Sequence, residues 1–255
     1  MQFDDAVGFV EFMTKGQPSR PANVEEIIAI NQGRSPLTMG EPTALALTPD
    51  ELEKRVAAGG IVVDGRDSAV FGGGHIPGAF NIKMETPEFE QRVGWVVPKK
   101  LPIFLVLDSD LQLPVALRKL AFVGLDSRVE GFLGGGMGAW TAAGKSQATL
   151  SQISATELAG ILAGDAKMRV LDVREIDEWS AGHIDDAATM SFKLLADRIA
   201  DIGIGADEEL SVICAGGIRS STACSILLRN GYTRLRNVTG GMWAWRAAAR
   251  PAVTD

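Results

Sequence analysis

The chain has 255 residues, of which 46% are hydrophobic and 22% charged, and its formal net charge is −7. This composition is typical of a globular protein with enough core for two domains, and the negative charge argues against nucleic acid or an anionic membrane as a partner. No apolar run approaches the roughly 20 residues of a membrane span. The acidic start of the chain is unlike a secretory signal, and two cysteines do not make a disulfide framework. We therefore expect a cytoplasmic protein.

Residues 1–44 are expected to form a helical extension followed by a linker. Apolar side chains fall at helical spacing within residues 2–13, and residues 23–31 predict a second short helix with Asn23 as its N-cap. Prolines at positions 18, 21 and 36 interrupt the segment.

Beyond this extension the chain repeats itself at a period of about 106 residues. Four blocks recur in the same order, and a unit of this length is too long for a solenoid repeat. The sequence therefore predicts two copies of one domain, at residues 45–146 and 147–255. The paired blocks are Thr48–Leu52 with Ser154–Leu158, Val62–Arg66 with Val170–Arg174, Gly74–Ala79 with Gly182–Ala187, and Gly135–Trp140 with Gly240–Trp245.

Each copy alternates strands with helices, which favours an α/β fold with a central parallel sheet and helices on both faces. The first helix is capped by Thr48 with Pro49 behind it, and in the second copy by Ser154. Ligands in such sheets bind beyond the carboxyl ends of strands. The predicted strands are 61–64 and 103–107 in the first copy and 169–172 and 210–213 in the second, and the predicted helices are 88–93 and 113–122, then 193–201 and 219–229.

One strand of the second copy, residues 210–213, runs directly into the segment Cys-Ala-Gly-Gly-Ile-Arg-Ser at positions 214–220. Loop N–H groups, a helix N-terminus and a guanidinium all favour a thiolate at such a place. We expect Gly216 and Gly217 to adopt positive φ, so that the backbone can approach an anion closely. The candidate site residues are Cys214 as nucleophile and Ala215, Gly216, Gly217, Ile218, Arg219 and Ser220 as its binding loop.

Both copies resemble rhodanese domains in the Asp-x-Arg, Gly-His-Ile, strand–Cys loop and Gly-Gly-x-x-x-Trp blocks. The resemblance implies a sulfurtransferase in which Cys214 takes a sulfur atom from a small anionic donor, thiosulfate or a persulfide, and passes it to a thiol or cyanide. It implies no metal and no cofactor. In the first copy Asp108 stands at the cysteine position. A carboxylate repels the anion that such a loop holds, so we predict that this copy is inactive.

Residues 1–44 resemble, around Phe12–Thr14 and Arg20–Val24, the C-terminal tail of persulfide dioxygenases of the metallo-β-lactamase fold, some of which are fused to rhodanese domains. This second resemblance implies an alternative function, a sulfur-relay or binding module whose partner is a persulfide dioxygenase domain. A rhodanese-like phosphatase is a third alternative. The four residues between Cys214 and Arg219 argue against it, because rhodanese-like phosphatases have a longer loop between the corresponding cysteine and arginine.

Other reactive side chains are expected to be structural. His75 and His183 occupy the same turn of the two copies, beside one loop with a cysteine and one without, so we expect both to hold the turn. Asp64 with Arg66, and Asp172 with Arg174, are expected to form structural pairs. Cys224 is expected in the core, and Trp140, Trp243 and Trp245 are expected to pack the final helix of each copy; the rhodanese resemblance also allows Trp243 to line the mouth of the pocket.

Overall fold

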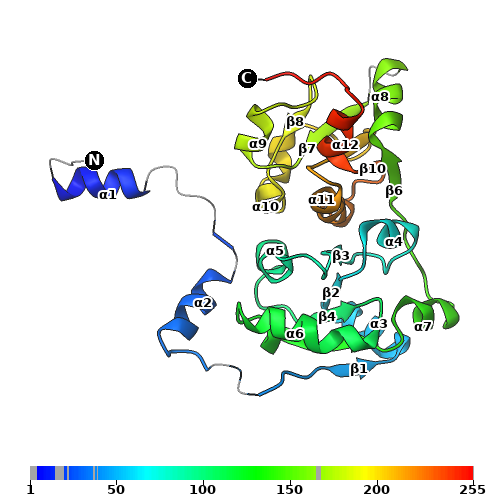
Figure 1. Cartoon of the computed structure of the whole chain (residues 1–255). Coiled ribbons are helices and arrows are strands. Elements are labelled where there is room, and N and C mark those ends of the chain that lie inside the picture. The colour runs from blue at the N-terminus through cyan, green and yellow to red at the C-terminus, as the bar shows by residue number, and fades with distance from the viewer. Residues whose placement is uncertain are drawn as a thin grey trace.

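A computed structural model describes residues 5–14, 20–21, 23–36, 38, 40–164 and 168–254. From residue 45 onward it contains two domains that repeat one architecture, connected by a short segment between residues 142 and 151 (Figure 1). The predicted duplication is thus present in three dimensions. Across the described ranges, no helix is both long and apolar enough to cross a bilayer.

The first domain is a five-stranded parallel sheet in the order β1-β5-β4-β2-β3. Its central strands are fully buried, which explains their continuous apolar sequences. The strands are β1 (Leu45–Leu47), β2 (Ile61–Asp64), β3 (Phe80–Asn81), β4 (Ile103–Val106) and β5 (Val129–Leu133). The helices are α3 (Pro49–Ala57), α4 (Ser68–Gly73), α5 (Phe89–Val96), α6 (Leu113–Ala121) and α7 (Gly136–Ala142), with 3-10 turns η1 (Asp110–Gln112) and η2 (Asp126–Arg128).

The second domain has the equivalent order, β6-β10-β9-β7-β8, and all of its pairs are parallel. Helices α10 and α11 lie on the side of this sheet that faces the first domain, and α8 packs with α12 (Figure 1). The strands are β6 (Ser151–Ser154), β7 (Arg169–Asp172), β8 (Ala188–Thr189), β9 (Leu210–Ile213) and β10 (Leu235–Thr239). The helices are α8 (Ala155–Gly164), α9 (Ile176–Ser180), α10 (Phe192–Leu195), α11 (Ile218–Arg229) and α12 (Gly241–Ala247), with the 3-10 turn η3 (Ile199–Ile202).

Matching caps begin the first helix of each domain. The Thr48 hydroxyl accepts the Glu51 N–H while the Glu51 carboxylate accepts the Thr48 N–H, with Pro49 in the first turn. Ser154 and Glu157 make the same reciprocal pair at α8. Both predicted caps are therefore confirmed.

One local prediction was wrong, and a second was right in position only. The single helix predicted over 193–201 is divided into α10 and η3, because the backbone leaves the helical region at Arg198 before Ile202 turns into the core. Asn23 does occupy the N-cap position of α2, but its side chain makes no capping bond; its amide instead donates to the Val123 carbonyl at 2.8 Å. This bond ties the extension to the first domain.

The extension contains α1 (Ala6–Thr14) and α2 (Val24–Asn31), so the two predicted helices are present. Part of the first prediction, residues 2–4, lies outside the described residues. In Figure 1, α2 lies beside the first domain and α1 lies away from both domains.

The domain interface has α11 of the second domain against β3 of the first as its largest contact, with further contacts of α10 with α5 and of β6 with α4. Asn81 on β3 is its polar centre: its side-chain oxygen accepts the Ser221 hydroxyl at 2.6 Å, its carbonyl accepts the Thr222 hydroxyl at 2.6 Å, and its N–H donates to Ser225 at 3.2 Å. All four residues are buried. These contacts fix the helix that follows Cys214 against the first domain.

Candidate active site

Cys214 lies directly after β9, the middle strand of the second sheet, at its carboxyl end. The connection to α11 is shorter than predicted: only residues 214–217 are loop, because α11 already begins at Ile218. Ile218, Arg219 and Ser220 therefore belong to the first helical turn. The Cys214 sulfur is buried and accepts the Gly217 N–H at 3.1 Å. A helix N-terminus and an aimed N–H both favour negative charge on that sulfur.

The two loop glycines have different roles. Gly217 has φ of 97° and forms the N-cap of α11, as predicted. Gly216 does not adopt positive φ, so that part of the prediction was wrong. A Cβ on Gly216 would come within 2.8 Å of the Trp243 ring, so the residue is small because an indole packs on it.

The start of α12 holds the loop from the other side. The Met242 N–H donates to the Cys214 carbonyl at 2.8 Å, and the Trp243 N–H donates to the Ala215 carbonyl at 2.9 Å. Gly241 permits this approach, because a Cβ there would lie 2.2 Å from the Cys214 carbonyl oxygen. The Gly-Gly-x-x-x-Trp block thus fixes the backbone of the cysteine loop.

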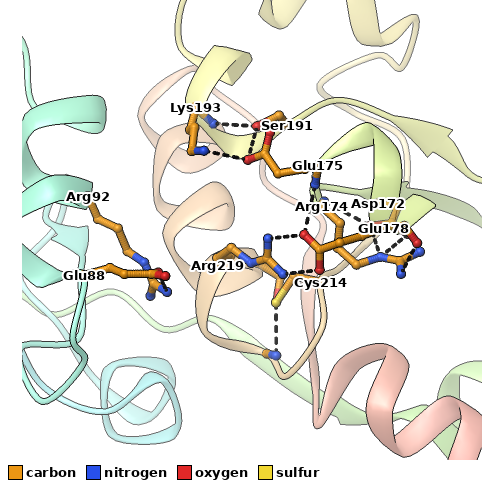
Figure 2. A network of polar contacts seen from close by, with 12 residues as sticks. Glu88, Arg92, Asp172, Arg174, Glu175, Glu178, Ser191, Lys193, Cys214 and Arg219 are labelled. Carbon is orange, nitrogen blue, oxygen red and sulfur yellow. Dashed lines mark hydrogen bonds and ion pairs between the residues drawn. The ribbon is translucent and has the colours of Figure 1, made fainter. Parts of the chain in front are cut away.

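Arg219 makes a two-pronged ion pair with Glu178, its Nη1 and Nη2 lying 2.6 and 2.7 Å from the two carboxylate oxygens (Figure 2). Arg219 lowers the pKa of Glu178. Glu178, with a further contribution from the charge of Cys214, raises the pKa of Arg219. The guanidinium is therefore a fixed cation close to the sulfur.

Ser220 and Asn237 form a buried polar pair below the sulfur. The Ser220 oxygen lies 3.4 Å from the Cys214 sulfur and 2.6 Å from Asn237 Oδ1. One hydroxyl proton can go to either neighbour, and the shorter contact favours Asn237. The Asn237 amide donates to Gln152 on β6 and to the Gly217 carbonyl. This network links three adjacent elements of the domain to the loop.

A cavity of about 380 Å³ opens above Cys214. It is bounded by both domains, because the first domain supplies Arg92 on α5 and Glu88 at the N-cap of that helix (Figure 2). Its lining is Glu88, Arg92, Glu178, Cys214, Ala215, Gly216, Ile218, Arg219 and Trp243. A second cavity of about 210 Å³ shares Glu88, Arg92 and Arg219 with it and adds Gln91, Trp95, Glu175, Phe192 and Lys193.

The family model described as "Rhodanese-like domain" matches residues 48–143 and again residues 154–248. The chain belongs to the rhodanese family. Each match covers one of the two sheets described above.

Similar proteins include a "Sulfurtransferase" of Allochromatium vinosum, which is 31% identical over 104 residues, 41% of this chain and 95% of that protein. The "Thiosulfate sulfurtransferase GlpE" of Shewanella oneidensis is 31% identical over 81 residues, 32% of this chain and 78% of that protein. Among solved structures, a thiosulfate sulfurtransferase from Pseudomonas aeruginosa is 22% identical with a TM-score of 0.38, and the match covers 82% of this chain and 43% of the other.

The first rhodanese domain lacks the features that surround Cys214. Asp108 is exposed, and its N–H donates to Gln112 Oε1 at 3.1 Å rather than facing a bound anion. The Gly135 N–H, at the start of α7, donates to the Asp110 carboxylate at 3.1 Å. A side chain of the loop therefore already occupies donors of the kind that an anion would need.

The two histidines hold the same turn in both rhodanese domains, as their duplicated position predicted. His75 stacks on Phe71 and contacts its carbonyl at 2.9 Å; His183 does the same with Trp179 at 3.1 Å. Their backbones form isolated bridges to Ala148 and Val253. Burial lowers the pKa of His75. Within the described part of the chain, no group of three or more His, Cys, Asp or Glu side chains is placed to hold a metal ion.

The Asp-x-Arg motifs are buried ion pairs that close the same turns. Arg66 lies 2.6 Å from Asp64 and also donates to the Gly74 carbonyl; Arg174 lies 2.6 Å from Asp172 and donates to the Gly182 carbonyl.

Cys224 is fully buried in α11. Burial raises the pKa of its thiol, and the charge of Cys214 raises it further. Trp140 and Trp245 are in the core, whereas Trp243 is 68% exposed at the cavity.

Sequence reasoning missed four residues of this site: Glu178, Asn237, Glu88 and Arg92. A signal existed for two of them. Asn237 is a polar residue within a buried strand, and Glu178 follows Arg174 by four residues on α9, just before the Gly-His-Ile block. Nothing in the sequence connects α5 of the first domain to the second domain's cysteine.

Proposed function

We propose that this rhodanese is a sulfurtransferase in which Cys214 carries a sulfur atom between a small donor and a thiol or cyanide acceptor. The observation that carries the proposal is the position of the Cys214 sulfur: it lies at the base of an open cavity, at a helix N-terminus, with the Gly217 N–H directed at it. The names of the related proteins support the same reaction class.

In the first step the Cys214 thiolate attacks the outer sulfur of the donor. A new bond forms between the two sulfurs, and the donor's own bond to that sulfur breaks, with its electron pair leaving on sulfite from thiosulfate or on a thiolate from an organic persulfide. Cys214 then holds a persulfide anion. The loop N–H groups at the start of α11 and the Arg219 cation stabilise this charge.

In the second step a thiolate or cyanide attacks the outer sulfur of the Cys214 persulfide. The sulfur–sulfur bond breaks and the electron pair returns to Cys214, so the thiolate is regenerated and no external oxidant or reductant is needed. Donor and acceptor use the same cavity in turn, which gives ping-pong kinetics. The first domain takes no sulfur itself, because Asp108 offers no nucleophilic sulfur.

The test is an intact-mass measurement after incubation with thiosulfate and, separately, with glutathione persulfide. We expect the protein to gain the mass of one sulfur atom and to lose it on adding cyanide. Cys214→Ser should gain none. Cys224→Ala is the matched control and should load normally, because Cys224 lies outside the cavity lining. Absence of the gain with every sulfane donor would end the proposal.

The source of the donor is a separate question, on which a persulfide dioxygenase partner remains the alternative suggested by residues 1–44. A comparison of initial rates decides it. Fast loading from glutathione persulfide with slow loading from thiosulfate favours the relay, and rapid turnover of thiosulfate with cyanide favours a thiosulfate enzyme. Release of phosphate from an aryl phosphate would instead indicate the phosphatase alternative.

A further inference from the structure

Arg92 is an unusual cation, because it is buried yet only partly paired. It lies on α5 of the first domain, and its side chain is 10% exposed. Nη2 donates to Glu88 at 2.7 Å, but Nε and Nη1 have no hydrogen-bond partner among the residues that the structure describes. Buried donors normally have a hydrogen-bond partner, and leaving a buried donor without one is costly. The unpartnered Nε and Nη1 of this buried guanidinium indicate a binding site for an anionic ligand.

The direction of this side chain points to the ligand's location. Arg92 lines both the cavity above Cys214 and the adjoining cavity, and Figure 2 shows it reaching from α5 toward Arg219. Helix α5 is held by Phe89, Val93 and Val96, which are buried in the first domain's core. The guanidinium is thus positioned before any ligand arrives.

The other cations of the two cavities are also paired with carboxylates. Arg219 gives both terminal nitrogens to Glu178, and Lys193 lies 3.0 Å from Glu175. Arg92 shares only one nitrogen with Glu88, whose side chain is 58% exposed and so well solvated. Among these three cations, Arg92 is the one with buried nitrogens that have no partner in the described structure, so it is the one that a second carboxylate would satisfy.

The size of the site indicates an organic ligand. A cavity of about 380 Å³ is within the range of roughly 300–1,000 Å³ that pockets for small organic molecules occupy. In thiosulfate the anionic group is bonded directly to the transferred sulfur, so it stays beside Cys214. A carboxylate at the far end of an organic persulfide can instead extend across the cavity to the other domain.

We propose that Arg92 of the first domain binds a carboxylate of the sulfur donor, and that the donor is a carboxylate-bearing organic persulfide. The proposal rests on the proposed function, in which Cys214 takes the donor's outer sulfur. It gives the domain without a cysteine a direct part in substrate recognition.

The experiment compares two donors and three proteins. The donors are glutathione persulfide and the persulfide of glutathione diethyl ester, which lacks both carboxylates. With the wild type we expect kcat/KM for Cys214 loading to fall about 10-fold to 100-fold for the ester, mainly through KM, as expected for losing a hydrogen bond between charged groups. With Arg92→Gln both donors should load at the slow rate of the ester. Arg118→Gln is the matched control, since it also removes an Arg–Glu pair of the first domain but at its surface.

Each outcome is decisive. If Arg92→Gln loads sulfur and prefers the free acid as strongly as the wild type does, the Arg92 proposal is overturned while the sulfurtransferase proposal stands. If the wild type itself does not distinguish the two donors, the Arg92 proposal falls without any variant. If Cys214 gains sulfur from neither donor nor from thiosulfate, both proposals fall.

Discussion

At the scale of single residues, the second domain differs from the first by a charge pair as well as by the cysteine. Arg219 and Glu178 are bonded to each other beside Cys214, and the matched positions of the first copy are Leu113 and Val70. The sequence could identify Arg219 as a site residue. It could not show that the guanidinium pairs with the carboxylate of Glu178, which lies 41 residues earlier in the chain. Contacts at such separation depend on how the two turns fold together, which local patterns do not encode.

The Arg219–Glu178 ion pair predicts different sulfur-loading rates for a single and a double variant. Arg219→Gln should slow single-turnover sulfur loading about 10-fold to 100-fold, because it removes the cation and leaves the Glu178 carboxylate unpaired beside an anionic intermediate. The double variant Arg219→Gln with Glu178→Gln should recover part of that loss, because the uncompensated charge is gone. Rapid-quench mass measurement of the Cys214 adduct gives the rates. Equal rates for the single and double variants would show that the Glu178 charge does not act on the sulfur.

At the scale of elements, sequence patterns located strands better than helix ends. The buried apolar runs 61–64, 169–172 and 210–213 gave strand bounds that agree with β2, β7 and β9. Helix α11 begins before the predicted residue because Gly217, at φ of 97°, lets the chain turn into the helix at once. Two glycines predict a turn, but the sequence does not show which of them takes the left-handed conformation; in the structure it is Gly217.

The role of Gly217 can be tested by an alanine substitution, with Gly231 as the control position. Both glycines have positive φ, and they lie near the two ends of α11. A Cβ on Gly217 would lie 3.2 Å from the backbone of residues 238–240, whereas one on Gly231 would meet nothing within 4 Å. Gly217→Ala should therefore lower the free energy of unfolding by about 2–3 kcal/mol and slow sulfur loading, because the N–H directed at Cys214 moves. Gly231→Ala should cost only about 1 kcal/mol and load normally. Urea unfolding and the mass assay measure both; equal behaviour of the two variants would contradict this account.

At the scale of the whole molecule, the duplication, the parallel α/β fold and the position of Cys214 at a strand end followed from repeated sequence blocks. The arrangement of the two domains did not. Helix α11 carries buried hydroxyls at Ser221, Thr222 and Ser225, and three of their contacts go to Asn81 of the other domain. A polar helix face usually predicts exposure to solvent, and only the partner domain shows that this one is buried.

This interface predicts that Asn81 stabilises the pair of domains. Asn81→Ala would leave the Ser221 hydroxyl and the Arg66 carbonyl without their amide partner, while the Asp64 carbonyl would keep only the Ile82 N–H. We expect the free energy of unfolding to fall by about 2–3 kcal/mol, the cost of buried polar groups left unsatisfied. Asn230→Ala, at the exposed end of α11, should cost less than about 1 kcal/mol. Urea unfolding followed by tryptophan fluorescence makes the comparison, and a cost for Asn81→Ala no larger than for Asn230→Ala would refute it.

The segment that joins the two domains has little slack. Ala148 exchanges both backbone hydrogen bonds with His75 at 2.9 Å, and the Leu150 N–H donates to the Gly72 carbonyl at 3.0 Å, so the connection is tied to the first domain almost to the start of β6. With α11 also tied to β3, the two walls above Cys214 cannot swing apart without breaking these bonds. The two walls of the cavity are therefore held at a fixed separation by hydrogen bonds on both sides of it.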